Sequence, residues 1–199
     1  MVRFFDILFS LLGIILLSPL FLVVALLIMF DSKGGVFYLQ PRVGRDNQDF
    51  ILVKFRSMSV GADQKGGLTV GASDNRITKM GLVLRKYKLD ELPQLLNIIK
   101  GEMSLVGPRP EIRKYVDLYT PGQRKVLGVK PGLTDYASIA FFRENDILGR
   151  ASDPEKTYIE VIMPEKIRLN MHFIDHPTIS SYFSVLGKTI LRWVRGDRK

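Results

Sequence analysis

The chain has 199 residues, of which 46% are hydrophobic, and a formal net charge of +9 at pH 7. This length predicts one domain with appendages, and the hydrophobic fraction excludes a disordered low-complexity chain. The positive charge favours anionic partners, namely nucleic acid, phosphates or an anionic lipid surface. The lack of cysteine excludes disulfides and cysteine-based metal sites.

The N-terminal segment is the most apolar part of the chain. Residues Ile7 to Phe30 include no charged side chain. As a straight helix this run would extend over roughly 36 Å, enough to cross the hydrocarbon core of a bilayer. It is too long for a cleaved signal peptide, and no small-x-small cleavage site follows it. We therefore expect residues 1–32 to form a retained membrane anchor.

Pro19 should bend this helix at its centre. Proline donates no hydrogen bond to the carbonyl of Ile15, and in lipid the hydroxyl of Ser18 is a local partner for that carbonyl. Basic residues stand on both flanks, Arg3 before the run and Lys33 after it. A spanning helix would place one basic flank outside, against the positive-inside tendency. A bent spanning helix is the alternative; we favour a re-entrant helix-break-helix with both ends on the cytoplasmic face.

Residues 33–199 are expected to form one cytoplasmic domain. Two β-prone runs at 36–40 and 50–55 flank the turn sequence Gly44-Arg45-Asp46-Asn47 and predict a β-hairpin. Residues 61–75 are rich in turn-forming side chains and predict a loop. Helical spacing then returns and ends at Gly101. The apolar face of that helix is formed by Leu89, Leu92, Leu96 and Ile99.

The C-terminal half predicts further helices. Residues 110–119 have a helical pattern, 136–142 an extended one, and 154–175 helical spacing in two pieces broken by Pro164. Residues 179–199 are amphipathic and basic, which suits a helix at the lipid headgroups or an ordinary surface helix. The predicted fold class is α+β: a re-entrant anchor and a small, mostly helical catalytic domain with a β-hairpin and amphipathic interfacial helices.

Two adjacent carboxylates, Asp90 and Glu91, are surrounded in sequence by basic residues. Pro93 is tolerated only in a first helical turn, which places Asp90 near the N-cap and Glu91 in that turn. Neighbouring helical residues do not face each other, so no shared-proton dyad is expected, and the helix dipole and nearby arginines should keep both groups ionised. An ionised aspartate can attack phosphorus and an ionised glutamate can hold Mg²⁺; helix capping explains the same two residues in isolation.

Arg109 lies in a rigid turn between Pro108 and Pro110. The fixed backbone reduces the entropy lost when its guanidinium binds an oxyanion in a bidentate manner, although a rigid turn with a surface arginine fits equally. Three further cations are candidate phosphate ligands or solvated charges: Lys54, Arg56 and Arg85.

A series of motifs occurs in one order along the chain. They are Ser18-Pro19, Gln40-Pro41-Arg42-Val43-Gly44, Lys54-Phe55-Arg56-Ser57-Met58, Arg76-Ile77-Thr78, Leu84-Arg85-Lys86, Leu89 to Leu95, Lys100 to Pro110 and Lys130 to Thr134. In this order they resemble the monotopic phosphoglycosyl transferases, the small single-domain form of the bacterial sugar transferase family. The resemblance covers positions from about Phe4 to Thr134 and is highly specific.

The resemblance implies an activity. Such enzymes move a sugar-1-phosphate from a UDP-sugar to polyprenyl (undecaprenyl) phosphate and release UMP, at the cytoplasmic face of the bacterial inner membrane, as the first membrane step of glycoconjugate assembly. It implies a covalent phosphosugar on Asp90, and Mg²⁺ on the diphosphate held by Glu91 together with Asp90. The substrate-binding and phosphate-binding residues implied are Lys54, Arg56, Arg85, Arg109 and Thr134.

The sugar stays open. Many family members continue the turn after Thr134 with Gly-Trp-Ala-Gln, whereas this chain has Asp135-Tyr136-Ala137-Ser138, and residues 141–146 also differ. A membrane-tethered nucleic-acid binder would use the basic charge, but no nucleic-acid motif is present. A non-catalytic membrane scaffold would have no need of the acidic pair and its cations. A homodimer through the membrane helices is compatible with the sequence, and nothing in it requires one.

Overall fold

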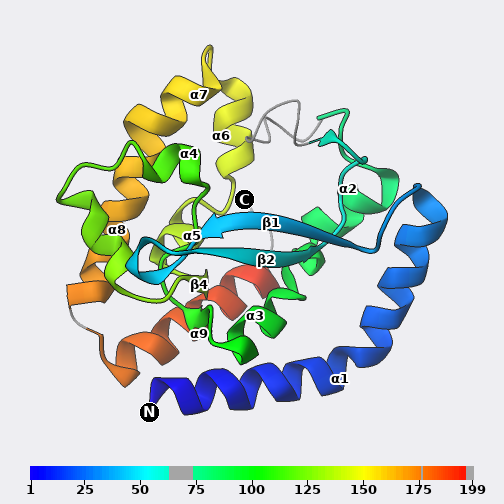
Figure 1. The fold of residues 1–199 in the computed structure, drawn as a ribbon, viewed down its shortest axis with the longest axis horizontal. Helices are drawn as coiled ribbons and strands as arrows, with labels where there is room; N and C mark the ends of the chain where they lie inside the picture. The colour runs from blue at the N-terminus through cyan, green and yellow to red at the C-terminus, as the bar shows by residue number, and fades with distance from the viewer. Residues whose placement is uncertain (63–73, 176, 196–199) are drawn as a thin grey trace.

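The structure, a computed structural model, describes residues 1–62, 74–175 and 177–195 (Figure 1). It is an α+β protein in which a long N-terminal helix, α1 (Val2–Asp31), lies along one side of a domain of short helices and two small sheets. Most of the loop expected at 61–75 and the last residues of the predicted C-terminal helix lie outside the described residues.

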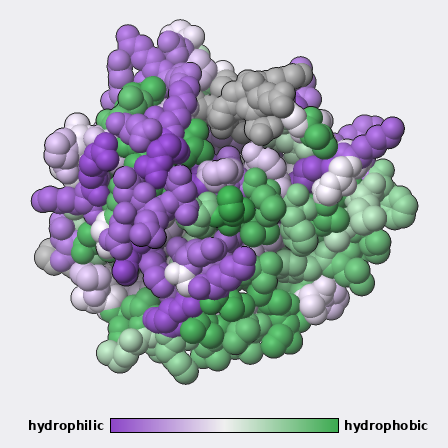
Figure 2. Space-filling model, viewed as in Figure 1, coloured by the Kyte–Doolittle hydropathy of each residue, from purple (hydrophilic) through white to green (hydrophobic). Residues whose placement is uncertain are grey.

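Helix α1 contains Pro19 and is drawn as two limbs that meet at a bend (Figure 1). The Ser18 hydroxyl donates to the carbonyl of Ile15 at 2.8 Å, which confirms the predicted partner of the carbonyl that proline leaves free. Among the described residues, α1 is the one helix long and apolar enough to cross a membrane, and little of it is buried against the domain. Hydrophobic side chains accordingly gather along the lower edge of the molecule in Figure 2.

The first turns of α1 are attached to the domain through Asp6, which is buried. Its carboxylate oxygen Oδ1 accepts hydrogen bonds from the Ser104 hydroxyl at 3.0 Å, the Leu105 N–H at 2.9 Å and the Tyr182 hydroxyl at 2.8 Å. This contact joins α1 to two distant segments of the domain, one at residues 104–105 and one at Tyr182.

Both ends of α1 contact the same domain. Near the N-terminus, Arg3 donates to the carbonyls of Ile98 and Ile99, the latter at 2.8 Å. At the C-terminus, Arg56 donates to carbonyls just past the helix, including that of Ser32 at 2.7 Å. Both ends of α1 are thus fixed to one compact domain.

The predicted β-hairpin is confirmed. Strand β1 (Phe37–Val43) pairs antiparallel with β2 (Asp49–Phe55), joined by the short η1 (Arg45–Asn47). Tyr38 lies opposite Lys54, and side chains alternate between the two faces of a strand, so Arg42 shares the inner face with both. The hairpin thus brings two cations, Arg42 and Lys54, to the interior side of the domain.

A second sheet consists of two three-residue strands, β3 (Ser104–Val106) and β4 (Gly132–Thr134), which pair in parallel. The sequence predicted only a turn around 130–132. A Cβ on Gly132 would lie 2.1 Å from the Gly107 nitrogen, so the close approach requires glycine. This pairing places Thr134 beside the rigid turn that carries Arg109.

The acidic pair lies between α2 (Lys79–Lys86) and α3 (Gln94–Lys100), in the short η3 (Leu89–Glu91). The predicted N-cap position of Asp90 is wrong: Pro93 precedes α3, and no side chain caps that helix. The chain instead turns at Lys88, whose φ is 54°, and the pair forms its own 3₁₀ turn. Gly101, with φ of 93°, ends α3 as predicted.

The C-terminal half differs in detail from the prediction. The helix expected at 110–119 is shorter, and the segment expected to be extended at 136–142 is helical because Asp135 caps it by accepting from the Ser138 N–H. The break within 154–175 is a π-helical turn before Pro164, not the proline itself. The elements are α4 (Arg113–Val116), η4 (Gln123–Gly128), α5 (Tyr136–Ala140), α6 (Glu144–Arg150), α7 (Pro154–Thr157), η5 (Tyr158–Ile162), α8 (Met163–Asp175) and α9 (Ile179–Arg195).

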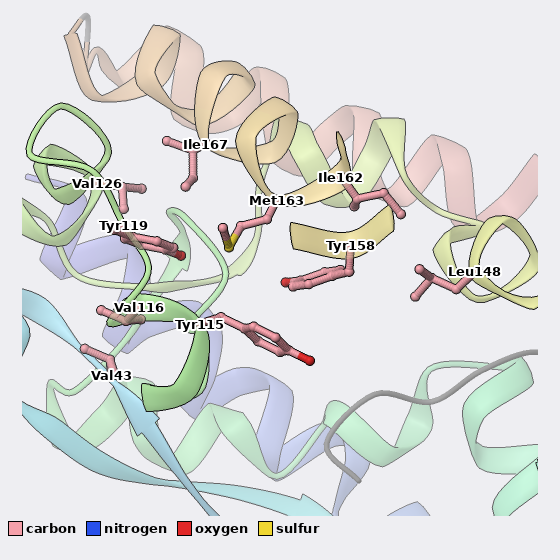
Figure 3. Close-up of a cluster of buried hydrophobic side chains, with 10 residues drawn as sticks. All are labelled: Val43, Tyr115, Val116, Tyr119, Val126, Leu148, Tyr158, Ile162, Met163 and Ile167. Carbon is pink, nitrogen blue, oxygen red and sulfur yellow. The ribbon is translucent and has the colours of Figure 1, made fainter. Parts of the chain in front are cut away.

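Two large cores position the site between them. One joins α4, η4 and α8 around Tyr115, Tyr158 and Met163 (Figure 3). The other joins β2, α3, β3 and α9 around Leu52, Ile98 and Tyr182. A smaller cluster attaches the C-terminal limb of α1 to the hairpin and α2. The cores leave a large cavity between the hairpin, the acidic turn, α5, α6 and α9.

Candidate active site

The cavity has a volume of about 650 Å³ and three kinds of wall. Its cations are Arg42, Lys54, Arg85, Lys88, Arg109, Lys166 and Arg192. Its carboxylates are Asp90, Glu91, Glu111 and Glu144. Its apolar side includes Leu17 and Leu20 of α1 and Leu186, Ile190 and Trp193 of α9. A cavity of this size holds a small-molecule ligand, and its excess of cations favours an anionic one.

Glu91 is bound by Arg109. The guanidinium donates to both carboxylate oxygens, to Oε2 at 3.1 Å and through a second hydrogen bond to Oε1. Burial would raise the pKa of the Glu91 carboxyl, but the charges of Arg109 and Lys54 outweigh it and lower that pKa to about 2. Glu91 is therefore ionised at neutral pH, as predicted.

Asp90 is in a different state. Its side chain is 7% exposed, and within the described part of the chain its Oδ1 has no hydrogen-bond partner. Burial, and then the charge of Glu91, raise the pKa of the Asp90 carboxyl, against the opposing charges of Lys54 and Arg85. The sequence predicted that the surroundings keep both carboxyls ionised; they lower the pKa of Glu91 but raise that of Asp90. A desolvated carboxylate with an open oxygen is suited to nucleophilic attack.

Lys54 projects from the inner face of the hairpin toward the acidic pair. Burial lowers the pKa of its ammonium, and repulsion from Arg42 and Arg109 adds to this, whereas Glu91 and Asp90 oppose it; the resulting pKa is about 7. Because burial and the neighbouring cations destabilise its charged form, the Lys54 ammonium should bind an anionic ligand strongly.

Two further predicted ligands reach the cavity. Arg85 lines it and donates to the Ser57 hydroxyl at 3.0 Å, and burial lowers the pKa of its guanidinium. Thr134 also lines it, with its hydroxyl 2.7 Å from that of Thr189 on α9. The structure thus brings together six predicted residues: Lys54, Arg85, Asp90, Glu91, Arg109 and Thr134.

Arg56 does not join them. It is absent from the cavity lining, and its guanidinium binds carbonyls at and beyond the end of α1, those of Ile28, Ser32 and Lys33. The role of Arg56 is to fix the anchor to the hairpin. Ser18 and Pro19 also lie outside the lining, but Leu17 and Leu20 on either side of them contribute to it.

Sequence reasoning missed Arg42 as a cavity residue. Arg42 binds Glu111 at 3.2 Å and the carbonyl of Pro110 at 3.0 Å. A signal was available, because strand alternation places Arg42 on the same face of the hairpin as Lys54. Sequence reasoning also missed Lys88 and Arg192. Four more missed residues come from separate segments and carried no such signal: Glu111, Glu144, Tyr158 and Lys166.

Asp135, where the chain departs from the family turn, supports Arg109. Its Oδ2 accepts from the Arg109 N–H at 3.0 Å and from the Asn170 amide at 2.6 Å, while its Oδ1 caps α5. The departure therefore fixes the backbone of the residue that binds Glu91.

The site offers few groups to a metal ion. Within the described ranges no group of three or more histidine and acidic side chains could hold one. Mg²⁺, however, is commonly held by one or two carboxylates, with phosphate and water oxygens completing the shell. The open Oδ1 of Asp90 and the ionised Glu91 fit that donor set in the presence of a phosphorylated substrate.

A family model described as bacterial sugar transferase matches residues 1–196, and the chain belongs to this family. A relative from Aeromonas hydrophila, a UDP-N-acetylgalactosamine-undecaprenyl-phosphate N-acetylgalactosaminephosphotransferase, is 41% identical over 162 residues, which cover 80% of this chain and 37% of that protein. The resemblance found in the sequence is confirmed.

Two other relatives have names that do not mention N-acetylgalactosamine. The exopolysaccharide production protein ExoY of Sinorhizobium fredii is 43% identical over 147 residues, 66% of this chain and 65% of that protein. A UDP-glucose:undecaprenyl-phosphate glucose-1-phosphate transferase of Klebsiella pneumoniae is 41% identical over 150 residues, 73% of this chain and 32% of that protein. The chain thus spans less than two thirds of the length of these relatives.

Proposed function

We propose that this protein transfers a sugar-1-phosphate from a UDP-sugar to polyprenyl phosphate and releases UMP, as a membrane step of polysaccharide assembly. The observation that carries the proposal is the buried Asp90, whose Oδ1 is open in a cavity lined by Lys54, Arg85 and Arg109. The substrates are those in the names of relatives that transfer sugar phosphates to undecaprenyl phosphate.

The proposed mechanism has two displacements at one phosphorus atom. The Asp90 carboxylate attacks the sugar-bearing phosphorus, a phosphorus–oxygen bond forms, and the bond to the leaving UMP breaks. A phosphate oxygen of the lipid then attacks the same phosphorus and releases the carboxylate. Lys54, Arg85 and Arg109 offset the negative charge that would otherwise repel Asp90. Two steps allow the water-soluble product to leave before the lipid binds.

We propose Glu91, with Asp90, as the residue that holds Mg²⁺ on the diphosphate. The bound ion would neutralise phosphate charge. Removal of divalent cations with a chelator should abolish UMP release, and Mg²⁺ should restore it. Full activity after chelation, in the absence of any divalent cation, would contradict this assignment.

We propose that α1 is re-entrant and that the domain lies on the cytoplasmic face of the membrane. The contacts at both ends of α1 support this, as does the hydrophobic lower edge of the molecule (Figure 2). Leu17 and Leu20, beside the bend, share a cavity with Asp90, which gives a polyprenyl chain an apolar approach from the bilayer. A homodimer through α1 stays a prediction.

The chemistry is tested by the first displacement alone. With each member of a panel of UDP-sugars and no lipid acceptor, the productive donor should release UMP and leave a phosphosugar mass on the Asp90 peptide. Asp90→Asn should abolish both, whereas Asp117→Asn, at an exposed carboxylate, should change neither. Transfer by Asp90→Asn at the wild-type rate would rule out the covalent step.

The topology is tested with single cysteines, since the chain has none of its own. In intact spheroplasts, a membrane-impermeant thiol reagent should fail to label a cysteine at Val2 or at the exposed Ser152. In inverted vesicles it should label both. Labelling of Val2→Cys, but not Ser152→Cys, from the periplasmic side would mean a spanning helix.

A further inference from the structure

One wall of the cavity plays no part in the phosphate chemistry described above. It is formed by Glu111, Glu144, Tyr158 and Lys166, which we call the polar wall; all four line the same cavity as Asp90. Glu111 follows Arg109 by two residues, so the wall begins where the phosphate-binding residues end. A donor whose phosphorus lies at Asp90 would share its cavity with this wall.

The wall depends on an irregularity in the backbone. Tyr158 is the first residue of η5, the π-helical turn between α7 and α8. Its ring is buried, with its centroid 4.8 Å from that of Tyr115 (Figure 3). Its hydroxyl donates to Glu111. Burial and the charge of Glu111 raise the pKa of this hydroxyl, so it keeps its proton. π-helical turns of this kind often occur at functional sites.

Lys166 and Glu144 complete the wall as a fixed ion pair. Their charged atoms are 2.9 Å apart, their side chains are 16% and 23% exposed, and the Lys166 ammonium lies 5.3 Å from the centroid of the Tyr158 ring. The described residues provide no hydrogen-bond donor to Glu144 Oε1. The pair therefore presents an ordered ammonium and a carboxylate oxygen with unused hydrogen-bonding capacity.

The charge of the wall defines the class of ligand. Lys166 balances Glu144, and Arg42, a neighbour of the wall, balances Glu111. The wall and Arg42 together are therefore neutral, whereas the surroundings of Asp90 are rich in cations. A phosphate favours the cationic end. A neutral group with several hydroxyls suits a wall that both donates and accepts hydrogen bonds.

We infer that the Lys166–Glu144 pair recognises hydroxyl groups of the donor's hexose, and that this hexose is neutral rather than a uronic acid. The inference rests on the proposed function. A carboxylate on the sugar would find Lys166 already paired with Glu144, and Arg42 already paired with Glu111. Sites that bind a hydroxyl through buried polar groups discriminate strongly against analogues that lack it, because those groups are then left without partners.

The test compares donors in variants of the pair. Wild-type protein is first assayed for UMP release with a panel of UDP-hexoses, their monodeoxy analogues and a UDP-uronic acid. Lys166→Met and Glu144→Gln should each lower kcat/KM for the preferred hexose by about 10- to 100-fold, and should have much less effect on the analogue without the recognised hydroxyl. Inhibition by UMP, which lacks the sugar, should be unchanged.

Controls come from the same helix. Arg168 and Glu165 form an exposed ion pair on α8, and Arg168→Met and Glu165→Gln should leave donor preference unchanged. Melting temperatures identify variants that do not fold. Glu144→Gln keeps the size and shape of the side chain, so it alone can test the inference if Lys166→Met is unstable.

The outcomes separate the inference from the function on which it rests. If wild-type protein releases no UMP from any donor, the proposed function fails. If it does, equal losses on the hexose and all its deoxy analogues would overturn the inference. Weaker UMP inhibition in the variants would overturn it as well, because the wall would then bind the nucleoside.

Discussion

Arg109 binds both carboxylate oxygens of Glu91, while the next carboxylate in the chain, Asp90, keeps an oxygen without a partner among the described residues. Two adjacent acids in one 3₁₀ turn thus differ in their surroundings, because in the described part of the chain a guanidinium donates to Glu91 and none donates to Asp90. The pKa values follow this division, about 2 for Glu91 and a raised value for Asp90.

The first prediction concerns this guanidinium. Arg109→Lys keeps the charge but cannot donate to both oxygens of Glu91 in the same geometry. We expect UMP release to slow by about 10- to 100-fold, since charge-assisted hydrogen bonds are worth about 1.5–3 kcal/mol each. Arg113→Lys, at a more exposed arginine, is the matched control. A wild-type rate in Arg109→Lys would mean that the bidentate geometry is irrelevant.

The second prediction is a pH dependence set by Lys54. Because its pKa is lowered to about 7, the ammonium that we propose as a ligand of the diphosphate is charged below that pH and neutral above it. The groups that influence it are Arg42, Arg109, Glu91 and Asp90. The KM for the donor should rise as the pH increases through 7, and Lys54→Arg, which stays charged, should remove this rise.

The lowered pKa of Lys54 should also affect the pH dependence of the free energy of unfolding. Its pKa is about 7 when folded and 10.5 for an unperturbed lysine, so between these values the unfolded chain binds more protons. The free energy of unfolding should therefore increase with pH over this range. In Lys54→Met the increase should be reduced, measured by denaturant titration at pH 7 and pH 9; an unchanged slope would contradict the burial of the ammonium.

The third prediction concerns the contact between β3 and β4. Gly132→Ala places a methyl group 2.1 Å from the Gly107 nitrogen, so the strands must separate and displace Thr134 and the Arg109 turn. We expect a loss of stability of about 1–3 kcal/mol and a marked loss of activity. Gly122→Ala, with no atom within 4 Å of the added Cβ, should be close to neutral.

The fourth prediction concerns the anchor. Tyr182→Phe removes one of the three hydrogen bonds to Asp6 and should destabilise the protein by about 1 kcal/mol. Asp6→Ala leaves three donors without their acceptor and should cost several times as much. Tyr87→Phe, at an exposed tyrosine, is the control. Equal unfolding midpoints for Asp6→Ala and wild type would mean that the contact carries no stability.

Features with local causes could be predicted from the sequence. The hairpin, the end of α3 at Gly101 and the Ser18–Ile15 hydrogen bond each depend on residues close together in the chain. The parallel pairing of β3 with β4 could not, because each strand has three residues and the pairing depends on a distant glycine contact. The apolar pattern at residues 136–142 indicated an extended segment, but Asp135 caps a helix there, and the pattern alone did not reveal this cap.

The site residues that could be predicted from the sequence are those that belong to the family motifs. Lys54, Arg85, Asp90, Glu91, Arg109 and Thr134 all line the cavity. Arg56 stands in the same motif as Lys54, yet sequence charge cannot reveal that its guanidinium meets carbonyls of the anchor. The polar wall was missed because its residues come from separate segments that only tertiary packing brings together.

The attachment of α1 bears on how the protein can be handled. A version that begins after Asp31 would remove Leu17 and Leu20 from the cavity. It would also take the Ile28 carbonyl from Arg56 and the Asp6 carboxylate from the Tyr182 hydroxyl. Such a truncation would open the active site to water on its apolar side and strip hydrogen bonds from the interior. The buried residues of α1, namely Asp6, Ser10, Val24 and Ile28, thus belong to the interior of the domain, and we expect that purification of active protein requires the helix.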